Sequence, residues 1–199
     1  MKYFVFDLGG VLSVPMVSKK LYEQIKWKVS YEEFLDKFNN SEESIKVHKG
    51  EISTKEFFEY LKKYMDDNIT LEEFKNIYVN NNKFFNDTIE IIKKLKNLSY
   101  KVYLLSNLKE IDYEKFIKHF DISIFDELFL SFKLGMLKPN DDIYQYVINK
   151  LNTKPENIYF FDDNKENVEG AIKNGINAYQ VTGETVKKAV DNILISTIL

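Results

Sequence analysis

The chain has 199 residues, 44% of them hydrophobic and 30% charged, which is ordinary for a globular protein with a sizeable core. Its net charge of −3 offers no basic surface of the kind that binds nucleic acid. No stretch approaches the roughly 18 apolar residues that a membrane helix needs, and the lack of cysteine excludes disulfides and thiolate metal sites. We therefore expect a cytoplasmic protein without a membrane or nucleic-acid partner, and no obligate protein partner is evident.

All 28 basic residues are lysine, so the chain contains no arginine. Arginine is the side chain that binds phosphate or carboxylate through two parallel hydrogen bonds. An anionic ligand of this protein must therefore be held by ammonium groups, backbone N–H groups or a metal ion.

The first predicted element is a short buried strand over residues 2–6. This apolar run ends at Asp7 and at the pair Gly9-Gly10, as a parallel strand does where it enters a loop.

From about residue 18 to residue 82 the sequence predicts only helices, over 19–28, 31–39, 54–64 and 71–80. Ser30, Ser53 and Thr70 are each followed three residues later by a glutamate, which is the spacing of a capping box. An all-helical block directly after the first strand indicates a second small domain. We assign residues 15–82 to this helical cap.

After residue 83, strands and helices alternate. Strands are predicted over 101–105, 127–130, 157–161 and near 178–181, and helices over 88–97, 140–151, 166–174 and after residue 183. This alternation implies βαβ units and a parallel sheet. We predict an α/β protein, with a Rossmann-like parallel-sheet core of residues 1–14 and 83–199 and an inserted all-helical cap domain.

Polar residues stand at or just beyond the carboxyl ends of four predicted strands, where open α/β sheets bind ligands. They are Asp7, Ser106, Lys138 and the pair Asp162-Asp163. Carboxylates brought together repel one another unless a hard cation such as Mg²⁺ neutralises them. A lysine beside Asp7 would offset further charge and could hold a phosphoryl oxygen.

Four segments in order resemble the motifs of the haloacid dehalogenase (HAD) superfamily. FVFDLGGVL is similar to the first motif, LLSN to the second, LGMLKP to the third and FFDDNKEN to the fourth. The segment GEISTKEF at residues 50–57 and the surroundings of the last two motifs further resemble the branch containing bacterial sugar-1-phosphate phosphatases. The resemblance implies a Mg²⁺-dependent hydrolase of a small phosphorylated metabolite, such as a sugar phosphate.

The resemblance also implies roles for single residues. Asp7 would attack phosphorus and form an aspartyl-phosphate. Ser106 would bond a phosphoryl oxygen, and Lys138 would bridge Asp7 and the phosphate, which makes these three the catalytic set. The phosphate-binding set adds Leu8, Gly9 and Asn107 to Ser106 and Lys138.

The same resemblance implies the metal ligands. Mg²⁺ would be held by the carboxylates of Asp7 and Asp163 and the backbone carbonyl of Gly9. Asp162 would act behind these ligands or through water. Four residues after Asp163, where an acid is common in the superfamily, this chain has Asn167, which adds no charge.

Gly9 departs from the family pattern. Most HAD phosphatases carry a second aspartate there, which protonates the leaving group and later activates water, and such catalysis typically contributes about 10²–10⁴-fold. One hypothesis is a substrate whose leaving oxygen is acidic, such as the anomeric oxygen of a sugar 1-phosphate. The alternative is a low-turnover protein that binds phosphorylated ligands.

A 2-haloacid dehalogenase also lacks the second aspartate, but we rank that function lower. Those enzymes use a cap arginine, which this chain does not have, and they need no metal pair like Asp162-Asp163. In the cap, we expect His48 at the surface, and Trp27 and Tyr22 in the core.

Overall fold

The central strand β1 (Tyr3–Phe6) has a parallel partner on each side, so the residue that follows it lies in the middle of the sheet edge. The computed structural model describes residues 2–15, 17–66, 68–80 and 83–195. Its five parallel strands have the order β3-β2-β1-β4-β5. The other four are β2 (Lys101–Ser106), β3 (Glu127–Leu130), β4 (Ile158–Asp162) and β5 (Asn177–Gln180).

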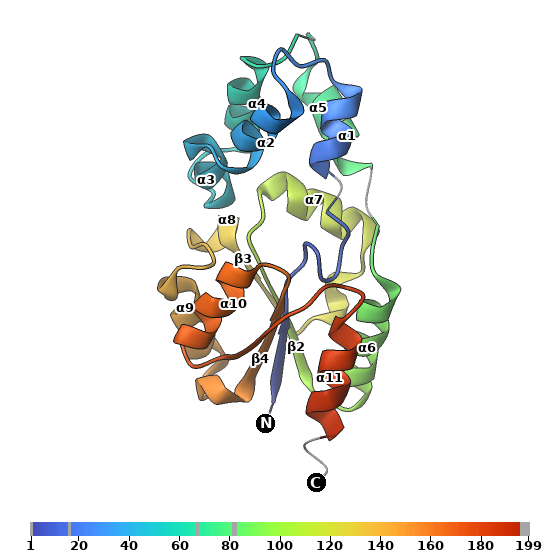
Figure 1. Cartoon of the computed structure of the whole chain (residues 1–199), viewed down its shortest axis with the longest axis vertical. Coiled ribbons are helices and arrows are strands. Elements are labelled where there is room, and N and C mark those ends of the chain that lie inside the picture. The colour runs from blue at the N-terminus through green and yellow to red at the C-terminus, as the bar shows by residue number, and fades with distance from the viewer. Residues whose placement is uncertain (1, 16, 67, 81–82, 196–199) are drawn as a thin grey trace.

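Helices cover both faces of this sheet (Figure 1). α6 (Asn86–Asn97) and α11 (Val186–Ile195) pack on the face that receives Phe4 and Phe6. α9 (Asp141–Leu151) and α10 (Lys165–Lys173) pack on the opposite face, which receives Val5. Strand residues alternate between faces, and each fully buried Phe contributes roughly 1.5–3 kcal/mol of apolar burial.

Successive strands are added first on one side of β1 and then on its other side. The chain runs from β1 to β2 and β3 on one side and then crosses to β4 and β5 on the other. Such a reversal opens a crevice at the carboxyl ends of the strands, and ligands of open α/β sheets bind there. β1 and β4 flank this point; Asp7 directly follows β1, and Asp162 is the last residue of β4.

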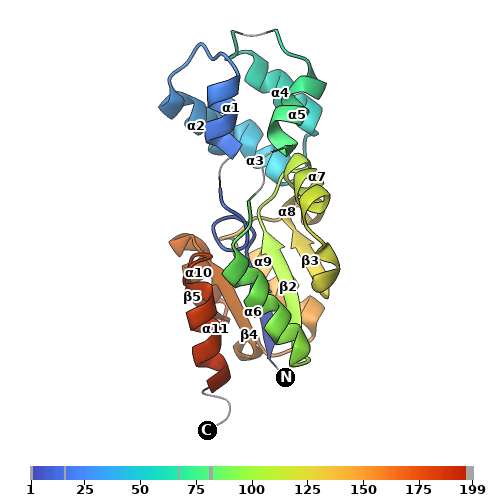
Figure 2. The same ribbon diagram turned by 90° about the vertical axis from the view of Figure 1, so that its right-hand side faces the viewer.

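Five helices lie together beyond this edge of the sheet, in both views (Figures 1 and 2). They are α1 (Val17–Gln24), α2 (Tyr31–Asn39), α3 (Glu42–His48), α4 (Thr54–Lys62) and α5 (Leu71–Val79). They share an aromatic-rich core that includes Phe34, Phe57, Leu61 and Phe74. The α/β class with a helical cap is therefore confirmed.

Hydrogen bonds at N-cap residues define where three of the cap helices begin. Complete capping boxes start α4 at Ser53 and α5 at Thr70. Ser30 accepts a hydrogen bond from the backbone N–H of Glu33, so that predicted box is only half formed.

α7 (Glu110–His119) joins the sheet to the cap helices (Figure 2). Its Ile111 packs into the core of the cap helices, whereas its Phe116 packs into the core of the sheet. The hydroxyl of Tyr78 on α5 donates a hydrogen bond to Asp112 on α7. The cap helices are thus fixed to the core through α7 as well as through the chain connections.

Three sequence predictions need correction. The helix predicted over 19–28 ends at Gln24, because the following segment pairs with residues 64–66, where Lys28 N–H donates to the Tyr64 carbonyl at 2.9 Å. The predictions missed α3, α7 and α8 (Ser131–Leu134). His48 is half-buried, and its Nδ1 lies 2.7 Å from the Ser44 carbonyl. The aromatic pair Trp27 and Tyr22 packs against the cap core as expected.

No helix within the described residues is both long enough and apolar enough to span a membrane.

Candidate active site

Asp7 lies buried at the carboxyl end of β1. Its backbone N–H donates to the carbonyl of Phe161 at 2.9 Å, which ties the start of the loop to β4. Its Oδ1 accepts hydrogen bonds from Ser106 Oγ at 2.7 Å and from Lys138 Nζ at 2.9 Å. Ser106 is the last residue of β2, so the pairing of β1 with β2 brings the two side chains together.

Lys138 inserts its ammonium group between two carboxylates. Nζ lies 2.9 Å from Asp7 Oδ1 and 2.6 Å from Asp162 Oδ2, and it donates a third hydrogen bond to the Leu105 carbonyl at 3.0 Å. All three donors of the ammonium are therefore used. Asn107 holds the backbone of Lys138 through two hydrogen bonds, at 2.8 Å to the carbonyl and 3.0 Å from the N–H.

Burial and neighbouring charges set the ionisation of these groups. Burial raises the pKa of Asp7 to about 6; the ammonium of Lys138 opposes this rise and the carboxylate of Asp162 adds to it. Burial acts to lower the pKa of Lys138, but the two carboxylates outweigh it and raise that pKa. Lys138 is therefore a permanent cation in the floor of the site.

A third carboxylate completes the cluster. Carboxylate oxygens of Asp7, Asp162 and Asp163 lie within 4.8 Å of one another. Burial and the charge of Asp162 raise the pKa of Asp163, as expected for carboxylates crowded together. Both oxygens of Asp162 already accept hydrogen bonds, which include those from the Asn164 N–H at 2.8 Å and the Asn167 side chain at 3.1 Å.

The loop at Gly9-Gly10 approaches this carboxylate cluster closely. Gly10 has a φ of +72°, and a Cβ there would come within 2.1 Å of Asp163 Oδ2. Only glycine therefore lets the loop approach this carboxylate so closely. The neighbouring donors are all oxygens, which suits a hard cation such as Mg²⁺.

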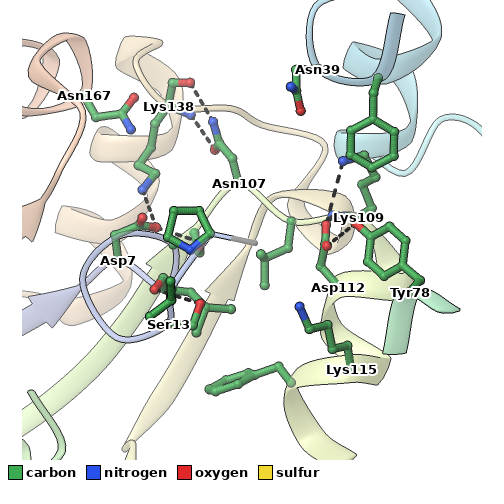
Figure 3. Close-up of a pocket in the computed structure, with 18 residues that line it drawn as sticks. Asp7, Ser13, Asn39, Tyr78, Asn107, Lys109, Asp112, Lys115, Lys138 and Asn167 are labelled. Atoms are coloured by element: carbon green, nitrogen blue, oxygen red, sulfur yellow. Dashed lines mark hydrogen bonds and ion pairs between the residues drawn. The ribbon is translucent and has the colours of Figure 1, made fainter. Parts of the chain in front are cut away.

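A cavity of about 290 Å³ opens above Asp7 (Figure 3). Among the predicted site residues, Asp7, Leu8, Gly9, Ser106, Asn107 and Lys138 line it, together with Asn167. Asp162 lies behind Lys138, and Asp163 lies beside the glycine loop. The structure thus brings six of the eight predicted residues to one end of one cavity and places Asp162 and Asp163 next to them, and the roles assigned to all eight stay predictions.

Sequence reasoning missed the other end of the cavity. Phe38, Asn39 and Tyr78 reach it from the cap helices, and Lys109, Asp112 and Lys115 reach it from the start of α7 and from α7 itself. These residues were missed because α7 was not predicted; Lys109, directly after the second motif, is the N-cap of this helix. With that helix predicted, the spacing of 109, 112 and 115 would have placed the three on one side of it.

Comparison with known proteins decides the family. A sequence model described as haloacid dehalogenase-like hydrolase matches residues 5–181. The chain belongs to this hydrolase family. The matched region contains the four motifs that surround the cavity, and it runs from within β1, before Asp7, to the end of β5.

One curated relative aligns with this HAD hydrolase over most of both chains, and three others align over a shorter segment. The chain is 28% identical over 196 residues to a D-ribitol-5-phosphate phosphatase of Bacteroides thetaiotaomicron, an alignment that covers 90% of this chain and 91% of that protein. Three further curated relatives match over 72–93 residues, and there the chain aligns with only 18% to 47% of their length.

Solved structures share the whole fold. A HAD-like hydrolase of Porphyromonas gingivalis superposes with a TM-score of 0.79 at 24% identity, covering 98% of each chain. A HAD-family enzyme of Bacteroides thetaiotaomicron, solved with magnesium and inorganic phosphate, superposes with a TM-score of 0.76 at 23% identity, covering 92% of this chain and 95% of that one. At these identities, the similarity demonstrates the fold of the HAD hydrolase.

Proposed function

We propose that this HAD hydrolase is a phosphatase of small phosphorylated metabolites such as sugar phosphates, with Asp7 as its nucleophile. The observation that carries the proposal is the shared environment of Asp7, which has a permanent cation on one side and a carboxylate cluster on the other, at the floor of a cavity. The D-ribitol-5-phosphate phosphatase that aligns over most of the chain supports the substrate class.

In the proposed reaction, an oxygen of Asp7 forms a bond to phosphorus while the bond from phosphorus to the leaving oxygen breaks. Lys138 and Ser106 hold Asp7 in place and stabilise charge on the phosphoryl group. Backbone N–H groups of Leu8, Gly9 and Asn107 are candidates to bind the remaining phosphoryl oxygens. Water then cleaves the aspartyl-phosphate, releasing phosphate and restoring the carboxylate.

The site fits a magnesium ion. Asp7, Asp163 and the backbone carbonyl of Gly9 would hold it, with Asp162 positioning the site through Lys138 and Asn167. Bound there, Mg²⁺ would neutralise the carboxylates and polarise a phosphoryl oxygen. The magnesium and phosphate in the related Bacteroides structure support this assignment.

We further propose that residues 15–82 act as the cap of a core made of residues 1–14 and 83–199. Phe38, Asn39 and Tyr78 of this segment line the cavity, so the cap would contact the part of the substrate that is not transferred. It would also exclude water during phosphoryl transfer.

Gly9 favours one other candidate function, binding of a phosphorylated ligand with little turnover. The glycine can neither protonate a leaving group nor activate water. A sugar 1-phosphate, whose leaving oxygen is more acidic than an ordinary alcohol, would tolerate this loss best.

A screen of phosphomonoesters with and without Mg²⁺, including sugar 1-phosphates, tests the two functions. Phosphate release that stops with EDTA and with Asp7→Asn supports the phosphatase. Mg²⁺-dependent binding of a phosphosugar without phosphate release supports the binding protein. Halide release from a 2-haloacid that survives EDTA would contradict both.

A further inference from the structure

The cavity continues from Asp7 to a second group of charged side chains, which the proposed reaction does not use. Lys109, Asp112 and Lys115 lie on the side of the cavity formed by α7, facing the cap helices (Figure 3). All three belong to a part of the site that would meet the end of a substrate far from its phosphate.

Two of these three side chains have electrostatic partners among the described residues, although only Asp112 is hydrogen-bonded. Asp112 accepts hydrogen bonds from the Tyr78 hydroxyl and, at 3.0 Å, from the Lys109 backbone N–H. The Lys109 ammonium lies 4.0 Å from the Asp112 carboxylate and 4.5 Å from the centre of the Phe38 ring. This group is therefore a fixed part of the cavity wall, with its charges paired.

Lys115, in contrast, has no such partner among the described residues. The residue is only 6% exposed, and within the described part of the chain its ammonium has no hydrogen bond and no ion pair. Its side chain extends from α7 toward the cavity (Figure 3). Burial and the charge of Lys20 lower the pKa of Lys115, while Asp112 opposes this. The Nζ atom is not among the solvent-sealed polar atoms that lack a partner in the described residues, so it is open to the cavity, where an anionic group of a ligand would supply that partner.

The charge and size of the cavity restrict that partner. Within this part of the cavity lining, two ammonium groups face one carboxylate, so Lys115 is the lining cation that is left without a paired charge; Lys20, which does not line the cavity, adds positive charge nearby. His48, which lies close enough to affect the charges of this group, is neutral at neutral pH because its pKa is lowered to about 4. A second phosphate would bring a charge of about −1.5 to −2, more than one ammonium balances, whereas a carboxylate brings −1. A volume of about 290 Å³ admits only a small substrate.

We propose that Lys115 binds a carboxylate at the end of the substrate opposite the phosphate, so that the preferred substrates are phosphorylated sugar acids. The inference rests on the proposed phosphatase function, and it adds the substrate class. Lys115 is then a specificity-determining residue that touches the substrate without taking part in the bond changes.

A matched pair of substrates tests this directly. Ribitol 5-phosphate and 5-phosphoribonate differ only in a terminal CH₂OH or carboxylate. We expect the wild-type enzyme to hydrolyse the acid with at least tenfold higher kcat/KM. Lys115→Met, which keeps most of the length of the side chain but removes the charge, should reduce this preference about ten- to hundred-fold. Lys118→Met makes the same change at an exposed position of α7 and should preserve the preference.

Equal preference in the wild type and in Lys115→Met would overturn the inference, as would a wild-type preference for ribitol 5-phosphate. A purely structural role would lower the melting temperature of Lys115→Met and leave the ratio of the two kcat/KM values unchanged.

Binding separates this inference from the proposed function. In an Asp7→Asn background with Mg²⁺, calorimetry should give a lower Kd for 5-phosphoribonate than for ribitol 5-phosphate, and Lys115→Met should abolish the difference. If no phosphomonoester is hydrolysed by the wild type, the phosphatase proposal fails, but this binding difference still decides whether Lys115 recognises a carboxylate.

Discussion

Lys138 and Asp162 form an ion pair that is sealed from solvent: Nζ lies 2.6 Å from Oδ2, and the two side chains are 1% and 0% exposed. The same ammonium contacts Asp7, so a single cation balances two buried carboxylates. Its removal would leave two like charges together without water to screen them.

Lys138→Met should therefore lower both stability and activity. We expect a loss of about 3–5 kcal/mol in the free energy of unfolding, because a broken buried pair leaves uncompensated charge. Urea denaturation measures it. Lys94→Met removes an exposed partner of Asp191 and should cost at most about 1 kcal/mol. Adding Asp162→Asn to Lys138→Met should recover part of the loss; no recovery would show that the charges are not the cause.

Gly9→Asp tests the account of the missing acid. A Cβ at this position meets only Asp7 Oδ2 within 4 Å, at 3.9 Å, so the backbone has space for a Cβ there. We expect kcat on esters of ordinary alcohols to rise at least about tenfold, within the range of general acid–base catalysis. Sugar 1-phosphates should gain much less. Steady-state kinetics with both substrate types provides the measurement.

Gly9→Asn is the control for Gly9→Asp, since it has a similar size but cannot donate a proton as an acid. If the two variants behave alike, or if Gly9→Asp leaves poor leaving groups unchanged, the glycine is not what limits the wild type.

Gly10→Ala should weaken magnesium binding. The new methyl group would lie 2.1 Å from Asp163 Oδ2, so the loop or the carboxylate must move. We expect the Mg²⁺ concentration for half-maximal activity to rise about tenfold or more, which a titration of phosphate release measures. Gly175→Ala shares the positive φ, at +81°, but its Cβ would meet only Pro155. An equal effect in both variants would point to general backbone strain instead.

His48 should make the fold more stable at neutral than at acidic pH. Burial first, and then the charge of Lys109, lower its pKa from 6.5 to about 4, against the opposing charge of Asp112. Between these values the unfolded chain binds a proton that the folded chain does not, so His48's contribution to stability rises with pH across this window.

The contribution of His48 lost on acidification is on the order of 1–3 kcal/mol. Urea denaturation at pH 4.5 and 7 should show this part of the pH dependence disappearing in His48→Gln. The same change at His119, the only other histidine, should preserve it. A wild-type pH dependence in His48→Gln would disprove the assignment.

Much of the core could be predicted from local patterns. The first four strands are short, mainly apolar runs that stop at a polar residue, and parallel strands bring such ends to one edge. That rule was sufficient to place Asp7, Ser106, Lys138 and the Asp162-Asp163 pair together, as the structure does.

The cap helices were only partly predictable. Helical spacing and capping residues located α2, α4 and α5, because these signals are local. The end of α1 depends on pairing between residues 26–28 and 64–66, which no local pattern reports.

The sequence by itself determined the class of fold, the nucleophile candidate and the acidic cluster, since strand ends, glycines and carboxylates are visible residue by residue. Only the tertiary structure decided what faces them across the cavity. α7 carries Ile111 into the cap core and Phe116 into the sheet core, and packing on both sides fixes where Lys115 points. Whether a buried lysine has a partner depends on contacts between distant segments, and those exist only once the chain has folded.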